Sequence, residues 1–207
     1  MTDAADLPQL YLITPTDFEL STYPDILGSV LDAQEIACVR LTLATRDEDR
    51  IARAADALRS VTMERDVALV IDTHMMLVER LGLDGVHLTD AARSVKKMRK
   101  ELGEDAIIGA FCGNSSHDGL TAGELGADYV SFGPVGNSPL FSGETAPLDL
   151  FQWWSQMIEV PVVAEGSLDV DLIRQLTPYT DFFGLGDEIW TNDDPVAALR
   201  TLVAAMS

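Results

Sequence analysis

The sequence predicts an α/β protein folded as a single-domain (β/α)8 (TIM) barrel. Eight short β-rich runs alternate with eight stretches of helical periodicity along 207 residues. Several of these runs are apolar on both faces, which is typical of parallel strands covered by helices. Eight strands in a chain of this length favour a closed barrel over an open doubly wound sheet, the main alternative fold. We therefore expect residues 1–207 to form one barrel domain.

The predicted strands are short and apolar. Val67–Ile71 and Val160–Ala164 show the pattern most clearly, because their positions are apolar on both faces of the strand. In chain order the eight runs are Leu10–Thr14, Ile36–Leu43, Val67–Ile71, Asp84–Leu88, Ala106–Phe111, Ala127–Gly133, Val160–Ala164 and Asp181–Leu185.

The intervening segments carry helix signals. Residues 51–58 place apolar side chains at i, i+3, i+4 and i+7. Gly82, Gly103 and Gly126 each stand between a helical stretch and the next strand, where a left-handed C-cap is expected. The pair Asp194-Pro195 predicts the start of the last helix, as an N-cap followed by proline at the first helical position. The only long connection, residues 135–146, should lie over the C-terminal mouth of the barrel.

Composition restricts the partners. The chain has 34 acidic and 14 basic residues, a net charge of −20, which argues against binding to nucleic acid or to an anionic membrane. Two cysteines make a disulfide framework improbable and indicate a reducing, cytoplasmic location. We expect a small-molecule ligand at the mouth of the barrel. The sequence leaves open whether the protein forms a homodimer.

In such barrels, functional side chains lie at or just after the C-terminal ends of the strands. The polar or reactive residues at these positions include Arg40, Thr42, Asp72, His74, His87, Asp90, Cys112, Ser138, Glu165 and Asp187. Two turns that contain glycine, residues 165–168 and 184–188, follow the last two strands. Backbone N–H groups of such turns often hold a phosphate, although the same glycines also suit tight turns, and both interpretations stay open.

Five segments carry a resemblance to a known family. They are Leu10-Tyr-Leu-Ile-Thr-Pro15, Asp84-Gly-Val-His-Leu88, Ile107-Ile-Gly-Ala110, the pair Gly126-Ala-Asp-Tyr-Val130 and Phe132-Gly-Pro134, and Pro161-Val-Val-Ala164. In this order and spacing they resemble the thiamine phosphate synthase and thiazole tautomerase superfamily. The resemblance implies a (β/α)8 barrel that joins hydroxymethylpyrimidine diphosphate to thiazole phosphate, releases pyrophosphate through a carbocation-like pyrimidine, and requires Mg2+.

The resemblance also implies that several charged site residues are replaced. The Gln, Arg and Lys of the second strand are matched by Arg40, Thr42 and Ala44, and the metal-binding Asp after the fourth strand by Ala92. We expect Asp72 and Asp90 to be substitute metal ligands. Asp72 stands one position early and should then face away from the site, unless a twist at the strand end turns it back. Asp187 stands where the family has a Ser. The repulsion between a carboxylate and a phosphate about 5 Å away would weaken phosphate binding by roughly 3 kcal/mol for each charge pair. Alternatively, Asp187 is an N-cap whose oxygen occupies the backbone donors.

The candidate ligand-binding residues are therefore Arg40, Thr42, His74, His87, Cys112, Gly133, Pro134, Ser138, Gly166, Ser167 and Gly186, with Asp72 and Asp90 for a metal. The first functional hypothesis is a thiamine phosphate synthase-like protein with a remodelled site. Its alternatives are a catalytically degenerate barrel that binds a ligand or regulates, and an enzyme of altered chemistry on an unphosphorylated small molecule.

Overall fold

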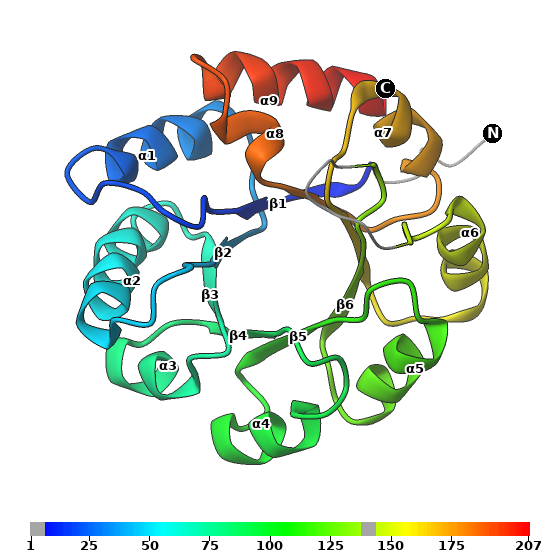
Figure 1. Ribbon diagram of the computed structural model, residues 1–207, viewed down its shortest axis with the longest axis horizontal. Coiled ribbons are helices and arrows are strands. Elements are labelled where there is room, and N and C mark those ends of the chain that lie inside the picture. Colours follow the sequence, from blue (N-terminus) through cyan, green and yellow to red (C-terminus); the bar gives the residue numbers. More distant parts are fainter. Residues whose placement is uncertain (1–6, 138–143) are drawn as a thin grey trace.

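The computed structural model describes residues 7–137 and 144–207, and it contains one closed barrel of eight parallel strands. Each strand pairs with its neighbours in chain order, and β8 closes the ring against β1 (Figure 1). The strands are β1 (Gln9–Ile13), β2 (Cys38–Leu41), β3 (Ala68–Asp72), β4 (Gly85–Leu88), β5 (Ile107–Phe111), β6 (Tyr129–Phe132), β7 (Val162–Glu165) and β8 (Phe182–Leu185). The predicted (β/α)8 barrel is confirmed, and every predicted strand overlaps an observed one.

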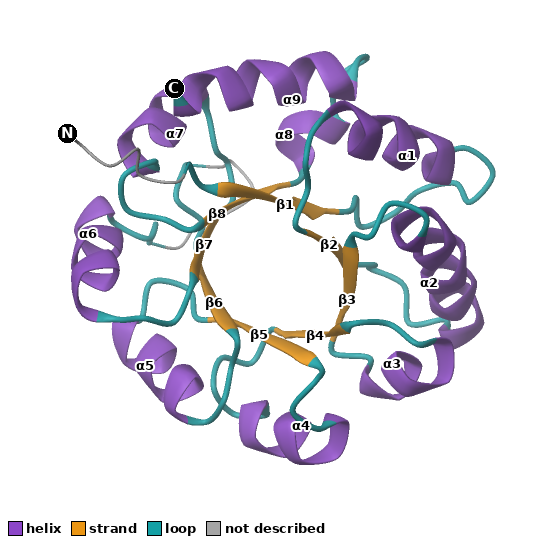
Figure 2. Cartoon of the chain, turned by 180° about the vertical axis from the view of Figure 1, so that it is seen from behind, coloured by secondary structure: helices purple, strands orange, loops and turns teal. Residues whose placement is uncertain are grey.

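Helices surround the barrel on all sides (Figure 2). They are α1 (Tyr23–Ala33), α2 (Glu48–Met63), α3 (Met75–Leu81), α4 (Val95–Leu102), α5 (Ser116–Glu124), α6 (Leu148–Met157), α7 (Val170–Leu176), α8 (Asp187–Trp190) and α9 (Pro195–Val203), followed by a 3-10 turn at Ala204–Met206. The predicted cap at Asp194 is present, since its carboxylate accepts from the Ala197 N–H. Gly82 ends α3 in the left-handed conformation, whereas Gly103 has a positive φ with extended ψ and Gly126 follows the C-cap of α5. Within the described residues, none of the helices has the length and apolar character to traverse a bilayer.

The barrel has an outer core and an inner core. The large outer core fills the space between strands and helices, and its biggest fully buried side chain is Trp154 of α6. The inner core is small and consists of Tyr11, Cys38, Val70, Tyr129 and Val163. Gly109 makes room for Tyr129, because a Cβ at Gly109 would lie 2.0 Å from the Tyr129 ring. The two tyrosines are therefore the bulkiest of the five side chains in this inner core.

Three aspartates fix the N-terminal ends of the strands. Asp84, Asp128 and Asp181 stand just before β4, β6 and β8. Their carboxylates accept backbone N–H groups from the preceding strands, at Leu69 (2.7 Å), Ile108 (2.7 Å) and Val162 (2.8 Å). Each bond joins an even-numbered strand to the odd-numbered strand before it, which fixes the register at the end of the barrel opposite the mouth.

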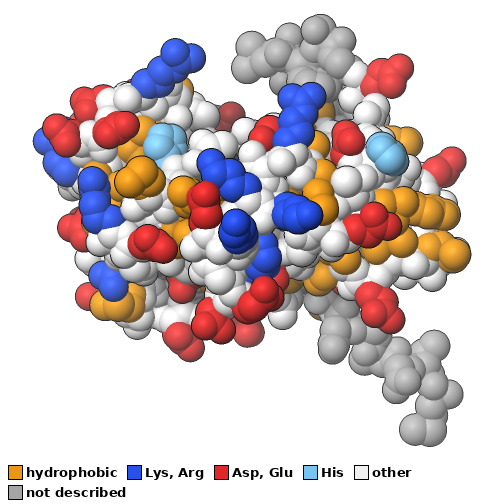
Figure 3. Space-filling model, turned by 90° about the horizontal axis from the view of Figure 1, so that it is seen from below, with side chains coloured by type: hydrophobic (Ala, Val, Ile, Leu, Met, Phe, Trp, Pro, Cys, Tyr) orange, Lys and Arg blue, Asp and Glu red, His pale blue; other side chains and the backbone are white. Residues whose placement is uncertain are grey.

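Basic side chains gather on one part of the surface, in spite of the net negative charge. The face shown in Figure 3 carries a group of Lys and Arg side chains with Asp and Glu around it. Helix α4 has four basic residues in eight positions, and Lys96, Lys97 and Lys100 among them are exposed. The net charge of −20 therefore does not give a uniformly acidic surface.

Candidate active site

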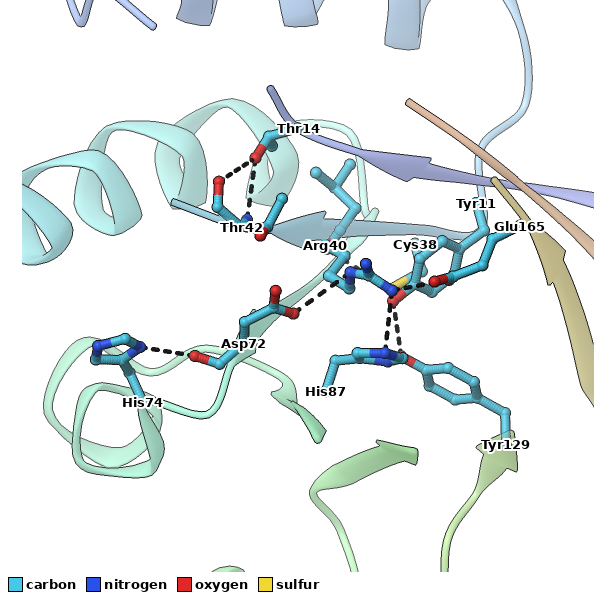
Figure 4. Close-up of polar contacts among 11 residues, drawn as sticks. Tyr11, Thr14, Cys38, Arg40, Thr42, Asp72, His74, His87, Tyr129 and Glu165 are labelled. Carbon is cyan, nitrogen blue, oxygen red and sulfur yellow. Dashed lines mark hydrogen bonds and ion pairs between the residues drawn. The ribbon is translucent and has the colours of Figure 1, made fainter. Parts of the chain in front are cut away.

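Arg40 of β2 lies at the centre of the barrel mouth and reaches across it (Figure 4). Its Nη1 donates to Glu165 Oε2 of β7 at 2.8 Å and to His87 Nε2 of β4 at 3.0 Å. Its Nε lies 3.3 Å from Asp72 Oδ1 of β3. This last contact is an ion pair without a hydrogen bond, because neither atom has a hydrogen-bond partner among the described residues. One guanidinium thus links three other strands.

Two carboxylates therefore face one buried cation. Burial raises the pKa of Glu165 and that of Asp72, and the nearby Arg40 cation opposes the rise in both. Burial alone would lower the pKa of Arg40, but its carboxylate neighbours, Glu165 above all, raise it. Arg40 is therefore charged at every physiological pH, while Glu165 and Asp72 compete for it.

A chain of hydrogen bonds leads from Arg40 down into the barrel. Arginine can only donate, so His87 Nε2 accepts and the imidazole proton is on Nδ1. Nδ1–H then donates to the Tyr129 hydroxyl at 2.9 Å, and the Tyr129 and Tyr11 hydroxyls are 2.7 Å apart. Burial, followed by the Arg40 cation, lowers the pKa of His87 well below its usual value, which agrees with a neutral ring. The predicted ligand residue His87 is completely buried and acts here as the acceptor that holds Arg40.

The two candidate metal ligands lie at the ends of neighbouring strands. Asp72 pairs in register with His87, and Asp90 follows His87 by three residues. The expectation that Asp72 faces away from the site is wrong, because its carboxylate contacts Arg40. The alternation of β3 accounts for this, because Val70 belongs to the inner core of the barrel and Asp72 lies two residues further on the same face of the strand. Asp90 Oδ2 accepts from the Ser94 hydroxyl at 2.6 Å, whereas Oδ1 of Asp90 is buried and has no hydrogen bond within the described residues.

Two cavities open next to these aspartates. One of about 190 Å³ is lined by Asp72 and His74, and another of about 640 Å³ is lined by Asp90, Cys112 and His117. Thr89 lines both cavities, so they are neighbours at the ends of β3, β4 and β5. Among the described residues, no cluster of three or more His, Cys, Asp or Glu side chains could hold a metal by itself. A cation here would need oxygen ligands from a bound substrate as well.

The two turns after β7 and β8 are joined by a side chain that the sequence did not single out. Glu188 Oε1 accepts from the Leu168 N–H at 3.0 Å, and Glu188 Oε2 accepts from the Gly186 N–H at 2.7 Å. The N-cap of α8 is Gly186, and the Asp187 side chain is exposed. The alternative that Asp187 caps this helix and occupies the donors is therefore wrong. Glu188, the next residue on α8, accepts hydrogen bonds from both backbone N–H groups instead.

The remaining predicted ligand residues have varied surroundings. Thr42 is half-buried, and its N–H donates to the Thr14 hydroxyl. The His74 ring contacts the Asp72 carbonyl through Nδ1, at 2.7 Å. Cys112 is buried, with its thiol directed at the Ala110 carbonyl.

The predicted residues on the loops after β6 and β7 lie together. Gly133 and Pro134, joined by a cis peptide bond, pack against the turn after β7, because a Cβ at Gly133 would lie 2.3 Å from the Glu165 carbonyl oxygen. Gly166 and Ser167 both have positive φ. Ser138 lies outside the described residues, as does the middle of the long loop after β6.

Sequence reasoning missed part of this arrangement. Glu165 was recognised at a strand end but not as the partner of Arg40. The sequence did not indicate that the hydroxyl groups of Tyr11 and Tyr129 form hydrogen bonds inside the barrel, although Tyr129 lies within one of the family motifs. Their alternation with outward apolar neighbours on β1 and β6 was the available signal. Glu188 carried no signal, since one acidic residue in a short helix has no distinctive spacing.

Comparisons with known proteins agree with the motifs. A family model described as thiamine monophosphate synthase matches residues 10–179. Thiamine-phosphate synthases of Rhodospirillum centenum and Hyphomonas neptunium are 37% and 36% identical to the chain, and the matches cover 92% and 99% of the chain and 94% and 97% of the relatives. The fold is similar to that of a thiamine phosphate pyrophosphorylase from Pyrococcus furiosus, with a TM-score of 0.81 and 21% identity over 96% of this chain and 95% of that one. The chain therefore belongs to the thiamine monophosphate synthase family.

Proposed function

We propose that this protein transfers a pyrimidinylmethyl group from hydroxymethylpyrimidine diphosphate to a thiazole, the reaction type of thiamine phosphate synthases, in the cytoplasm. The relatives at 36–37% identity, matched over nearly the whole chain, support this reaction. The observation that carries the proposal is Arg40, a buried cation held at the mouth by partners from three other strands. Departure of a diphosphate requires fixed positive charge at the leaving group.

Arg40 can bind the diphosphate with the part of its guanidinium that its neighbours leave free. Nη1 is occupied by Glu165 and His87, and Nε faces Asp72. Nη2 has no hydrogen bond to any described residue, and it is not among the fully buried unpartnered atoms. Two N–H donors of Arg40 therefore remain for phosphate oxygens. Its neighbours fix the orientation of these donors before substrate binds.

The donor chemistry of the two aspartates fits Mg2+. Asp90 Oδ1 is a buried carboxylate oxygen without a hydrogen bond to described residues, and Asp72 Oδ1 is buried and faces Arg40 Nε at 3.3 Å, also without a hydrogen bond. Magnesium commonly takes one or two protein carboxylates together with oxygens of a substrate phosphate. Asp72 and Asp90 would hold the ion, which when bound would neutralise charge on the leaving diphosphate.

The test incubates the purified protein with both thiamine precursors and Mg2+, and measures thiamine phosphate by conversion to its fluorescent thiochrome. Product at a turnover typical of enzymes, about 1 s⁻¹ or within two orders of magnitude below it, supports the proposal. Arg40→Met should abolish this turnover. An active Arg40→Met variant would contradict the role given to the central cation.

One observation favours a second candidate, a barrel that binds a small molecule without catalysis. Two carboxylates compete for Arg40, so the mouth has less free positive charge than diphosphate departure demands. This candidate predicts binding of the pyrimidine diphosphate in calorimetry with no product after prolonged incubation with Mg2+ and a thiazole. Turnover in the same sample would exclude it.

A further inference from the structure

The carboxylate of Glu188 occupies the backbone donors of both glycine-bearing turns. The Leu168 N–H belongs to the turn after β7, and the Gly186 N–H belongs to the turn after β8. Each donates to a different oxygen of the same carboxylate, at 3.0 and 2.7 Å. A half-buried anion from the chain itself thus lies where these turns would otherwise hold the anionic group of a ligand.

This arrangement opposes a phosphate at the same place. A phosphate would have to replace two charge-assisted hydrogen bonds and lie beside the displaced carboxylate. The sequence places no Lys or Arg within residues 165–168 or 184–188 that could offset this repulsion. Both charge and hydrogen bonding therefore favour a ligand without a phosphate here.

We propose that Glu188 is a specificity-determining residue which makes an unphosphorylated thiazole alcohol the preferred acceptor. The inference rests on the proposed pyrimidinylmethyl transfer and specifies its second substrate. The thiazole ring nitrogen forms the new C–N bond to the methylene carbon, while the C–O bond to diphosphate breaks and its electron pair leaves with the diphosphate. The hydroxyl of the acceptor takes no part, so the product is thiamine without a phosphate.

The kinetic test compares the two acceptors at fixed pyrimidine diphosphate and Mg2+. In the wild type, kcat/KM for the thiazole alcohol should exceed that for thiazole phosphate by at least about tenfold, which corresponds to a single charge-assisted hydrogen bond denied to phosphate. Glu188→Ala should reverse or abolish this preference. Asp187→Ala is the matched control, because it removes a carboxylate one residue away whose side chain is exposed, and it should keep the wild-type ratio within about twofold.

A binding test separates this inference from the proposed reaction, since it needs no turnover. Inorganic phosphate is titrated into 15N-labelled protein, and the amide signals of Leu168 and Gly186 are followed. Glu188→Ala should bind phosphate at least about tenfold more tightly than the wild type, with shifts at both amides. Glu188→Gln, which retains the size of the side chain, should have an intermediate affinity and provides the comparison if the alanine variant does not fold.

Two results would overturn the inference. One is a wild type that binds phosphate as tightly as the Glu188 variants with shifts at both amides, and the other is a wild type that prefers thiazole phosphate. If neither acceptor gives product, the proposed reaction fails, but the phosphate titration still decides whether Glu188 excludes phosphate from the turns.

Discussion

Replacing Arg40 by methionine should destabilise the protein strongly, and more at high pH than at low pH. The change leaves three buried acceptors without their donor or ion-pair partner, namely Glu165 Oε2, His87 Nε2 and Asp72 Oδ1. Loss of one partner from a buried ion pair costs about 3–5 kcal/mol. In a chain of 207 residues this corresponds to a fall in Tm of roughly 6–20 °C.

The pH dependence follows from the direction of the two carboxyl shifts. Burial raises the pKa of Glu165 and of Asp72 in the folded chain, so the folded state binds protons more readily than the unfolded state. Their contribution to stability is present below the unfolded pKa values of about 4 and is lost as pH rises through the folded values. Without Arg40 these pKa values rise further. The destabilisation should therefore be smaller at pH 5 than at pH 8.

Urea unfolding followed by circular dichroism at both pH values provides the measurement. Arg174→Met is the control, because the ion pair of Arg174 with Asp171 is exposed and should change the free energy of unfolding by no more than about 0.5 kcal/mol. Arg40→Met combined with Glu165→Gln should recover part of the loss, since it removes one stranded carboxylate. The reasoning is refuted if Arg40→Met costs less than about 1 kcal/mol at pH 8, or costs more at pH 5.

Three further outcomes are expected. Gly109→Ala should reduce stability by about 1–3 kcal/mol, because the new methyl group would displace the Tyr129 ring; a normal melting temperature would contradict this. Burial raises the pKa of the Cys38 and Cys112 thiols to about 12, so both should react with a thiol reagent at pH 8 only after unfolding, and rapid labelling of the native protein would be the opposite result. Asp90→Asn should raise the Mg2+ concentration for half-maximal turnover roughly tenfold, whereas Asp118→Asn, in the same cavity, should leave it unchanged.

The fold could be predicted from the sequence because its determinants are local. Runs such as Val67–Ile71 are apolar on both faces, and only a strand covered by helices accounts for that. Strand ends follow from the same pattern, so the positions of Arg40, Asp72 and His87 at or near the mouth could also be expected. The alternation of strand and helix then determines the barrel with little further information.

The contacts within the site could not be predicted, because they depend on side-chain direction and on long-range geometry. The one-position offset from the family pattern turned Asp72 away from the site, yet Val70 of β3 faces the barrel interior, and Asp72, two residues further on the same face, reaches Arg40. Arg40 and Glu165 are 125 positions apart, and nothing local links them. The sequence also could not show that Glu188, and not Asp187, accepts from the backbone amides of the two turns. Only the orientation of α8 decides which carboxylate reaches them.

The hydrogen bonds of Asp84, Asp128 and Asp181 separate the demands of folding from those of chemistry. They hold strand pairs at the N-terminal end of the barrel, the end opposite Arg40 and Glu188. A substitution at Glu188 can therefore alter ligand choice without removing these hydrogen bonds. A change of acceptor that spares Arg40 and these three aspartates would keep both the central ion pairs and the strand pairing.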